Sequence, residues 1–322
     1  MKKNFFSLLF TFISFLAFGQ DYSGIDAHAK SIKYSRDIAK LTEKLTSPYQ
    51  DDESKVRAIF VWIASNIEYD HKKLAKMQKS GFKKTRFKGT KEELKAQRLA
   101  QIQEYIDDTL DDKKGVCQDF SWLFQAMCLH AGIECEFITG AGKTRPTLIG
   151  QANIPATHAW NAVKMNGKWA LMDVTWSTGM GEKEDFGKGF FNLDPKTMIM
   201  SHFPDEEEWQ LLDSVYSKTT FANLPYLYAG FIKYGVSDIT PFSGKVTKKD
   251  SIGLKINLPE GSKLLIAKNR KNTDVPFSFD GERYYFDFSK KTLSGNIDVC
   301  IMSSEGRVEP LYSLSMGVGS SN

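Results

Sequence analysis

A cysteine, a histidine and an aspartate stand in sequence contexts that suit a cysteine-nucleophile triad. Cys117 follows Gly115-Val116, and apolar residues recur at helical spacing from Phe120 to Cys128, so we expect Cys117 at a helix N-terminus. The unsatisfied N–H groups and the positive dipole end of a helix stabilise an anion such as a thiolate. The same N–H groups can hold an oxyanion, so acyl transfer is the leading chemistry.

The histidine and the aspartate of this set lie in a predicted hairpin. Asn166-Gly167 indicates a two-residue turn between β-prone runs at residues 158–165 and 168–176. In that register His158 and Asp173 are diagonal neighbours on one face, with Cα atoms roughly 7–8 Å apart. Asp173 can then fix the tautomer of His158 and leave its other nitrogen for the thiol. A slip of one residue would put the two on opposite faces.

These motifs resemble the transglutaminase-like superfamily, and its bacterial members are the nearest match. The three that carry the resemblance are Gly115-Val116-Cys117, His158-Ala159-Trp160-Asn161 and Asp173-Val174-Thr175-Trp176. Two further segments are similar to the superfamily. Residues 55–70 look like the helix and strand before its cysteine, and the segment from His202-Phe203-Pro204 to residue 212 looks like the domain end of kyphoscoliosis-peptidase-like relatives.

The resemblance covers about residues 55 to 215 and implies a papain-like α+β core, with the nucleophile's helix packed on an antiparallel sheet. It implies that Cys117 is the nucleophile, His158 the base and Asp173 the orienting acid. It does not imply one substrate, because the relatives include transglutaminases, proteases, amidases and members with no known activity.

The expected reaction begins with attack of Cys117 on a protein or peptide amide and leaves a thioester. Water then gives a protease or amidase, which we prefer slightly, and an amine acceptor gives cross-linking. The alternative is a catalytically silent binding or scaffold module with the same fold, of which cell-wall association is one form. A third hypothesis is a wall-remodelling protein whose C-terminal domain binds glycan.

Residues next to the triad are candidates for lining the substrate site, namely Gln118, Trp160 and Trp176, although core packing competes for the tryptophans. A supporting role for His202 near the cleft stays open. No cofactor or metal is expected, because the chain has neither a Cys-x-x-Cys pair nor a paired-histidine or calcium-loop motif. We expect Cys128 and Cys135 to be buried thiols, with a disulfide between them as the alternative. We expect Cys300 to be buried within the C-terminal domain.

The first nineteen residues predict export. Lys2 and Lys3 precede an apolar run at residues 5–18, and Ala17-Phe18-Gly19 fits a small-x-small cleavage site. A membrane anchor is the alternative, but the run is shorter than the ~20 apolar residues of a spanning helix. We therefore expect a signal peptide, a periplasmic or extracellular location, and no stable membrane insertion after cleavage.

The net charge of the chain indicates which class of partner it binds. Removing Lys2 and Lys3 lowers the net charge from +4 to +2, which argues against nucleic acid and favours a protein or peptide substrate, cell-wall peptide included. Residues 72–98 form a basic insertion with eleven lysines and arginines against two glutamates. We interpret this insertion as a solvated segment and predict a helix at residues 91–110. The alternative is a patch for an anionic polymer or an acidic substrate. No pattern specifies an oligomeric state.

The C-terminal part of the chain has a different hydrophobic pattern. Short alternating runs at residues 252–258, 263–267, 284–288 and 297–302 are separated by turn signals such as Pro259-Glu260-Gly261. They predict a small antiparallel, Ig-like β-sandwich at residues 237–322, after a transglutaminase-like domain at residues 20–236.

Overall fold

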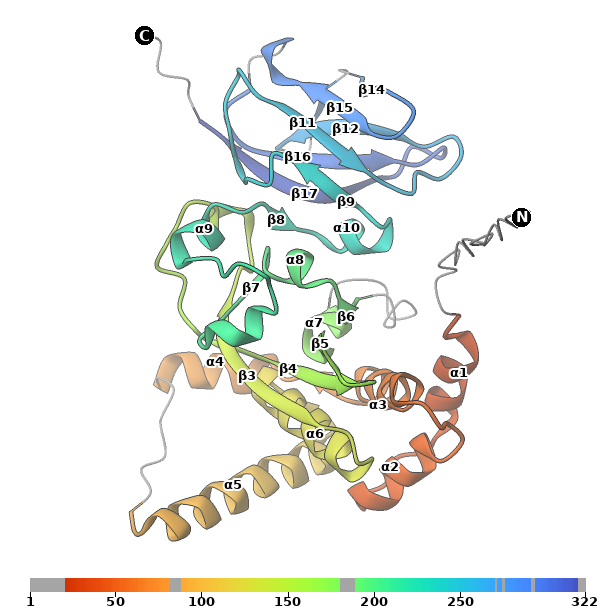
Figure 1. The fold of residues 1–322 in the computed structure, drawn as a ribbon, viewed down its shortest axis with the longest axis vertical. Helices are drawn as coiled ribbons and strands as arrows, with labels where there is room; N and C mark the ends of the chain where they lie inside the picture. Colours follow the sequence, from red (N-terminus) through yellow and green to blue (C-terminus); the bar gives the residue numbers. More distant parts are fainter. Residues whose placement is uncertain are drawn as a thin grey trace, which may run out of the picture.

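A helical layer, a five-stranded sheet and a β-sandwich follow one another along the long axis of the molecule (Figure 1). The computed structural model describes residues 21–80, 88–179, 189–269, 271–273, 276–290 and 293–317. The predicted signal peptide and, in the basic insertion, Lys83, Lys84 and Arg86 lie outside the described residues. No helix within the described ranges is long and apolar enough to cross a membrane.

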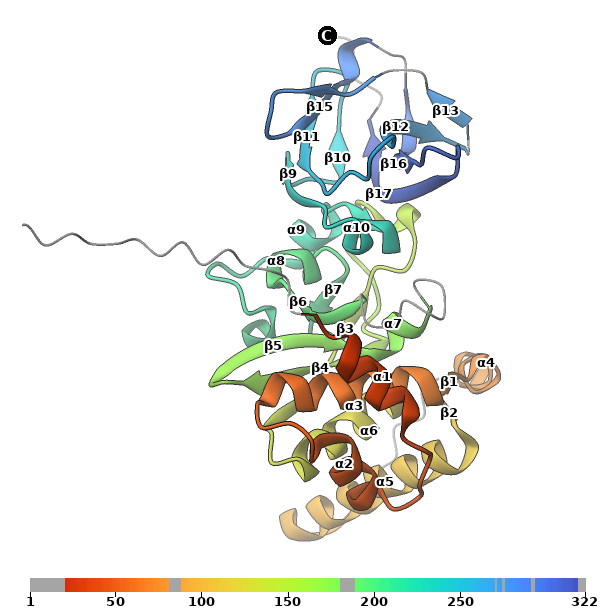
Figure 2. The ribbon, with the colours of Figure 1, turned by 90° about the vertical axis from the view of Figure 1, so that its right-hand side faces the viewer.

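The helical layer covers one face of the five-stranded sheet (Figure 2). Its central helix, α3, is buried from Val56 to Ala64, because apolar residues lie on all of its sides. The Asp51 side chain caps α3 by accepting from the Ser54 amide at 2.8 Å. The layer comprises α1 (Ser23–Ser31), α2 (Ile38–Thr46), α3 (Asp52–Asn66), α5 (Lys91–Asp112) and α6 (Cys117–His130).

The five-stranded sheet is antiparallel and has the order β6-β5-β4-β3-β7. Its strands are β3 (Cys135–Gly142), β4 (His158–Met165), β5 (Lys168–Asp173), β6 (Phe190–Leu193) and β7 (His202–Pro204). The central strand β4 packs on α6, so the first residue of β4 and the first residue of α6 can meet at one end of the sheet. The expected α+β core is confirmed.

The hairpin of β4 and β5 has the predicted register, from Met165 opposite Lys168 to Asn161 opposite Met172. Asn166 and Gly167 both have positive φ, 50° and 77°, as this type of turn requires. The expected continuation of the second strand to Trp176 is wrong. β5 ends at Asp173, whose carboxylate accepts from the Trp176 amide at 2.9 Å and begins α7 (Val174–Gly179).

The segment before the cysteine forms a two-stranded parallel sheet at the same end of the five-stranded sheet. β1 (Glu68–Tyr69) pairs in parallel with β2 (Lys114–Gly115) and leads into α4 (His71–Ser80). α5 begins at a capping box formed by Thr90 and Glu93, and the helix expected at 91–110 is confirmed.

The C-terminal β-sandwich consists of two sheets. One has the order β14-β15-β11-β9, with β9 (Ser237–Thr240), β11 (Ser251–Lys255), β14 (Ser278–Phe279) and β15 (Tyr284–Asp287). The other has the order β10-β17-β16-β12-β13, with β10 (Lys245–Val246), β12 (Lys263–Lys268), β13 (Lys271–Thr273), β16 (Gly295–Met302) and β17 (Val308–Met316). It is antiparallel except that β10 runs parallel to β17, which corrects the all-antiparallel expectation.

β17 pairs with three strands, β8, β10 and β16, and was not predicted. Pro310 lies within it, and proline argues against a strand interior because it lacks an N–H group. The structure accommodates Pro310 where the pairing of β16 with β17 changes register between Val299 and Cys300.

The sandwich and the five-stranded sheet are joined by a connector and share hydrophobic contacts. The connector contains α9 (Lys218–Ala222), β8 (Tyr226–Leu227) and α10 (Ala229–Lys233), whereas α8 (Pro195–Met198) links β6 to β7. One buried cluster unites Ala141 and Phe203 with Phe221 of the connector and with Leu254 and Val299 of the sandwich. β8 pairs with β17 although it precedes residue 237, and the boundary at residues 236 and 237 stays a prediction.

Candidate active site

Cys117 is the first residue of α6, as the sequence predicts. Its Sγ atom lies 3.8 Å from the Thr157 carbonyl oxygen, beside the start of β4, and the side chain is half-buried. The Asp119 carboxylate accepts from the Val116 amide at 2.8 Å and from the Lys73 ammonium at 2.6 Å. These bonds anchor the helix end that presents the thiol.

His158, the first residue of β4, lies between the thiol and a carboxylate. Its Nε2 atom is 2.6 Å from Oδ2 of Asp173, which leaves Nδ1 as the nitrogen available to Cys117. Burial alone lowers the pKa of His158, but the Asp173 charge and hydrogen bond, and to a smaller extent the Cys117 thiol, outweigh it and raise the pKa to about 10. The imidazole is therefore positively charged near neutral pH and can stabilise a thiolate.

Asp173, at the end of β5, is buried and held as an anion. Burial alone raises the pKa of its carboxyl group, but the charge of His158 and the hydrogen bonds of His158 and His202 hold that pKa well below its usual range. Its Oδ1 atom accepts from the Trp176 amide at the start of α7. The carboxylate therefore has a fixed orientation toward His158.

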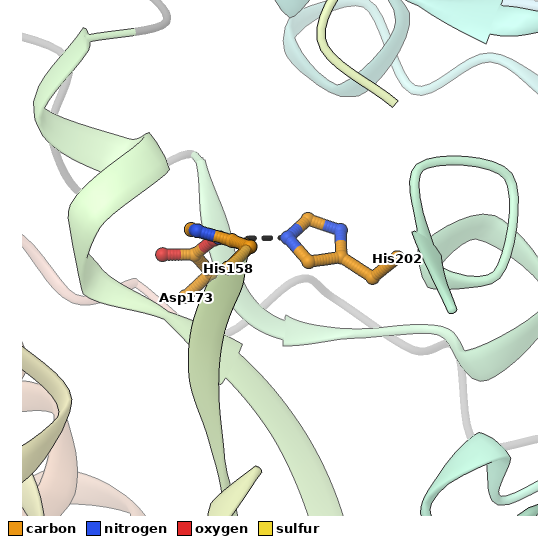
Figure 3. Close-up of side chains that lie close together, drawn as sticks. All are labelled: His158, Asp173 and His202. Carbon is orange, nitrogen blue, oxygen red and sulfur yellow. Dashed lines mark hydrogen bonds and ion pairs between the residues drawn. The ribbon is translucent and has the colours of Figure 1, made fainter. Parts of the chain in front are cut away.

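His202, from β7, is a second histidine on the same carboxylate (Figure 3). Its Nε2 atom lies 2.9 Å from Oδ2 of Asp173, and its Nδ1 atom lies 2.7 Å from Oγ of Ser201. Burial lowers the pKa of His202 to about 4, so the ring is neutral. Because a carboxylate only accepts, Nε2 carries the proton and donates to Asp173, and Nδ1 accepts from Ser201. The sequence left a supporting role for His202 open, and the long-range contact with Asp173 was not foreseen.

The three side chains also have the residue types of a metal site, with donor atoms within 4.8 Å of one another. However, the two histidine nitrogens lie 2.6 and 2.9 Å from one carboxylate oxygen. Those are hydrogen-bond separations, shorter than the about 3.3 Å between neighbouring ligands of a tetrahedral ion bound at ~2.0–2.1 Å. The arrangement fits an orienting network better than a metal centre.

Tyr69 is a candidate functional residue that the sequence did not single out. β1 places it opposite Gly115, two residues before the nucleophile, and the Asp70 amide donates to the Gly115 carbonyl at 2.8 Å. Its ring lies against Phe120. Burial, followed by the nearby Cys117 and Asp173 charges, raises the pKa of Tyr69 to about 12. The hydroxyl thus keeps its proton and can donate to an anion beside the thiol.

A cleft of about 770 Å³ opens beside His158, within the usual size of a ligand site. Trp176, a predicted lining residue, contributes to its wall together with Ile67, Tyr69, His71, Thr144 and Tyr226. The prediction for Trp160 needs correction, because Trp160 is 1% exposed and stacks behind the His158 ring in the core. Gln118 is half-buried next to the nucleophile and does not line the cleft.

The remaining cysteines, Cys128, Cys135 and Cys300, are free and buried, as expected. Cys128 and Cys135 lie close enough to interact, but they are separate thiols and not the disulfide kept as an alternative. Burial raises the pKa of Cys300 to about 12. Cys117 is therefore the accessible thiol of the chain.

Comparisons with known proteins place this site in a family context. A family model of the transglutaminase-like superfamily matches residues 39–174. Kyphoscoliosis peptidase of Mus musculus is 29% identical over 227 residues, which are 68% of this chain and 31% of that protein. Hillarin of Drosophila melanogaster is 27% identical over 206 residues, 56% of this chain and 25% of that protein. The chain spans less than a third of the length of these curated relatives.

The fold comparison gives a more distant likeness. A crystal structure of a TGase aligns at 15% identity with a TM-score of 0.29, over 50% of this chain and 35% of that chain.

Proposed function

The chain carries a domain of the transglutaminase-like superfamily, and from that premise we propose that it is an exported thiol enzyme that acts on protein or peptide amides by acyl transfer. Hydrolysis is preferred over cross-linking. The observation that carries the proposal is the ordered contact of Cys117, His158 and Asp173 at one end of the sheet. Two curated relatives bear the name peptidase, which supports the preference for hydrolysis.

The mechanism starts from the thiolate of Cys117 and the imidazolium of His158. The thiolate attacks the carbonyl carbon of the amide, and the resulting oxyanion accepts hydrogen bonds from the N–H groups that begin α6 and from the Tyr69 hydroxyl. The proton of His158 Nδ1 then passes to the departing amine, and the C–N bond breaks. A thioester on Cys117 and a neutral His158 remain.

The second half of the reaction reverses the proton transfer. His158 removes a proton from water, the oxygen attacks the thioester, and Cys117 leaves as a thiolate beside the restored imidazolium. A primary amine in place of water gives transfer instead of hydrolysis. Asp173 stays ionised throughout and holds the imidazole in place.

The proposal includes the location of the protein and the class of its substrate. The basic start and apolar run of residues 1–19 support export, so a substrate outside the cytoplasm, cell-wall peptide included, fits best.

Alkylation by iodoacetamide, followed by intact mass between pH 5 and 9, tests the proposal. We expect rapid labelling of one thiol per chain below pH 7, lost in Cys117→Ala and slowed in His158→Ala. Cys300→Ala is the matched control and leaves the rate unchanged, because that thiol is buried. Labelling as slow as that of a free thiol, and insensitive to His158→Ala, would instead support the alternative of a catalytically silent binding module.

A further inference from the structure

The C-terminal sandwich reaches the active-site cleft through one short strand. β8 pairs with β17, with Leu227 opposite Tyr312 and Tyr226 opposite Ser313. Tyr226 also lines the cleft that contains His158. One wall of the cleft is therefore presented by a strand of the C-terminal sheet.

Tyr226 is held in place from two sides. Its hydroxyl donates to the Thr144 carbonyl at 3.3 Å, and its ring meets the ring of Tyr228 edge-on at 4.9 Å. Burial raises the pKa of Tyr226, so the hydroxyl stays protonated as a donor. The ring is half-buried and still reaches the cleft.

A buried lysine fixes the segment that carries β8. The Lys143 ammonium donates to the carbonyls of Phe221 and Leu224 at 2.8 and 2.7 Å, and its side chain is fully buried. Burial lowers the pKa of Lys143 to about 7. A cation in the interior is costly unless it is hydrogen-bonded, so this contact favours one position of the segment. The preceding residue, Gly142, lies beside the rings of Trp176 and His158.

Apart from the His158 imidazolium, the cleft is lined by aromatic rings and uncharged polar side chains and carries little charge. Tyr69, Trp176 and Tyr226 contribute rings that are half-buried and reach the cleft. Glu68 is the only carboxylate among the lining residues of the described chain, and it lies 3.5 Å from the Lys114 ammonium. Aromatic walls of this kind favour flat apolar side chains, since rings gain from stacked and edge-on contacts beyond their buried area.

We propose that Tyr226 and Trp176 form a subsite for an aromatic side chain of the peptide next to the reacting amide, with Tyr226 supplied by the connector strand that pairs with the C-terminal sheet. The subsite rests on the proposed function, because the reacting amide must lie at Cys117. It gives the β-sandwich a role in selectivity through the pairing of β17 with β8, the strand that carries Tyr226.

The test measures the binding of two fluorescein-labelled peptides, Gly-Gly-Phe-Gln-Gly-Gly and Gly-Gly-Ala-Gln-Gly-Gly, to the full chain carrying Cys117→Ala, by fluorescence anisotropy. We expect the phenylalanine peptide to bind about fivefold more tightly, the size of an aromatic contact. Adding Tyr226→Ala abolishes this preference, whereas adding Tyr226→Phe keeps it. The matched control Tyr284→Ala, on the sheet that lacks β8, also keeps it. Equal affinity of the two peptides, or a preference that survives Tyr226→Ala, would overturn the subsite.

Failure of the subsite and failure of the proposed function give different results. Iodoacetamide needs no subsite, so the labelling rate of Cys117 in the chain with an intact cysteine reports on the proposed function by itself, and the control Tyr284→Ala leaves that rate unchanged. Fast labelling without an aromatic preference contradicts the subsite alone. Slow labelling with an aromatic preference contradicts the enzyme and leaves Tyr226 and Trp176 as a peptide-binding site without turnover.

Discussion

At the scale of residues, Asp173 is the centre of the candidate site, because one of its oxygens accepts from one charged and one neutral histidine. His158 is a cation at neutral pH and His202 is neutral. A charged hydrogen-bond donor strengthens the carboxylate's hold on the catalytic imidazole, and the neutral donor fixes the carboxylate without competing for its charge. Both rings are buried, so the asymmetry follows from their partners: His158 has the shorter contact with Asp173 and faces the Cys117 thiol, whereas the charge of His158 disfavours a second cation at His202.

Replacing His202 tests this division of roles. His202→Phe removes the donor to Asp173, so the carboxylate becomes more basic and the pKa of His158 rises. We expect kcat/KM on a peptide substrate to fall about tenfold or more, in line with a hydrogen bond to a charged group. The alkaline limb of the pH profile moves upward. His202→Gln keeps an amide donor and restores most of the activity. An unchanged profile in His202→Phe would show that His202 only fills space.

The buried His202 also makes stability depend on pH. Its pKa is about 4 in the folded state against about 6.5 in a model peptide, so the unfolded chain binds the proton more readily between these values. Stability from this group is present above pH 6.5 and is lost as the pH falls toward 4. From His202 alone we expect about 2 kcal/mol less free energy of unfolding at pH 5 than at pH 7, measured in urea, partly offset by His158, whose raised pKa makes its own contribution grow as the pH falls over the same interval. In His202→Gln this dependence is smaller by the same amount, and an equal dependence in both proteins would refute the assignment.

Tyr69 has a catalytic prediction of its own. Tyr69→Phe keeps the ring against Phe120 but removes the hydroxyl, whose pKa the charge of Cys117 helps to raise. We expect kcat to fall about 10²-fold, the typical effect of losing one oxyanion donor, with little change in KM. Alkylation of Cys117 by iodoacetamide forms no oxyanion, so its rate stays near that of the wild type. An equal loss in both assays would show that the hydroxyl acts on the thiol and not on the oxyanion.

At the scale of elements, the end of α6 is anchored through a charge from another helix. Asp119 is buried and accepts from Lys73 of α4. Lys73→Met leaves this carboxylate without its cation, and we expect a loss of about 2 kcal/mol in the free energy of unfolding. The value lies below that of a fully buried pair because the lysine is a third exposed. Lys72→Met, on the exposed face of the same helix, is the control and should change stability by less than about 0.5 kcal/mol. Equal effects of the two substitutions would contradict the anchor.

Local signals in the sequence predicted the elements that present the triad. The apolar spacing after Cys117 predicted α6, and Asn166-Gly167 fixed the register that brings His158 to Asp173. The end of β5 was missed, because whether a carboxylate caps the next turn depends on its own hydrogen bonds and not on strand propensity.

Contacts between distant segments were beyond the sequence. His202 meets Asp173 because β7 pairs with β3, although β3 and β4 separate β7 from β5 in the sheet. Tyr226 reaches the cleft only because β8 pairs with β17. The sequence does not indicate β17 as a strand, because β17 contains a proline. Such pairings depend on tertiary packing, which residue spacing alone does not specify.

At the scale of the whole molecule, the two parts of the chain share a buried cluster and a strand pairing. Phe203 of the five-stranded sheet packs on Phe221 of the connector, and the same cluster continues to Val299 in the sandwich. We therefore expect one cooperative transition in thermal unfolding of the mature chain, with coincident signals from near-UV and far-UV circular dichroism. Two separate transitions would show that the sandwich is an independent unit, and would weaken its assigned part in the substrate site.

The central claim is that Cys117, activated by His158, accepts an acyl group. Brief reaction of the mature chain with p-nitrophenyl acetate, followed by intact mass and peptide mapping, tests it most directly. We expect a burst of one p-nitrophenol per chain and one acetyl group on Cys117, with no adduct in Cys117→Ala and a much slower burst in His158→Ala. Acetylation spread over surface lysines, with Cys117 unmodified, would contradict it.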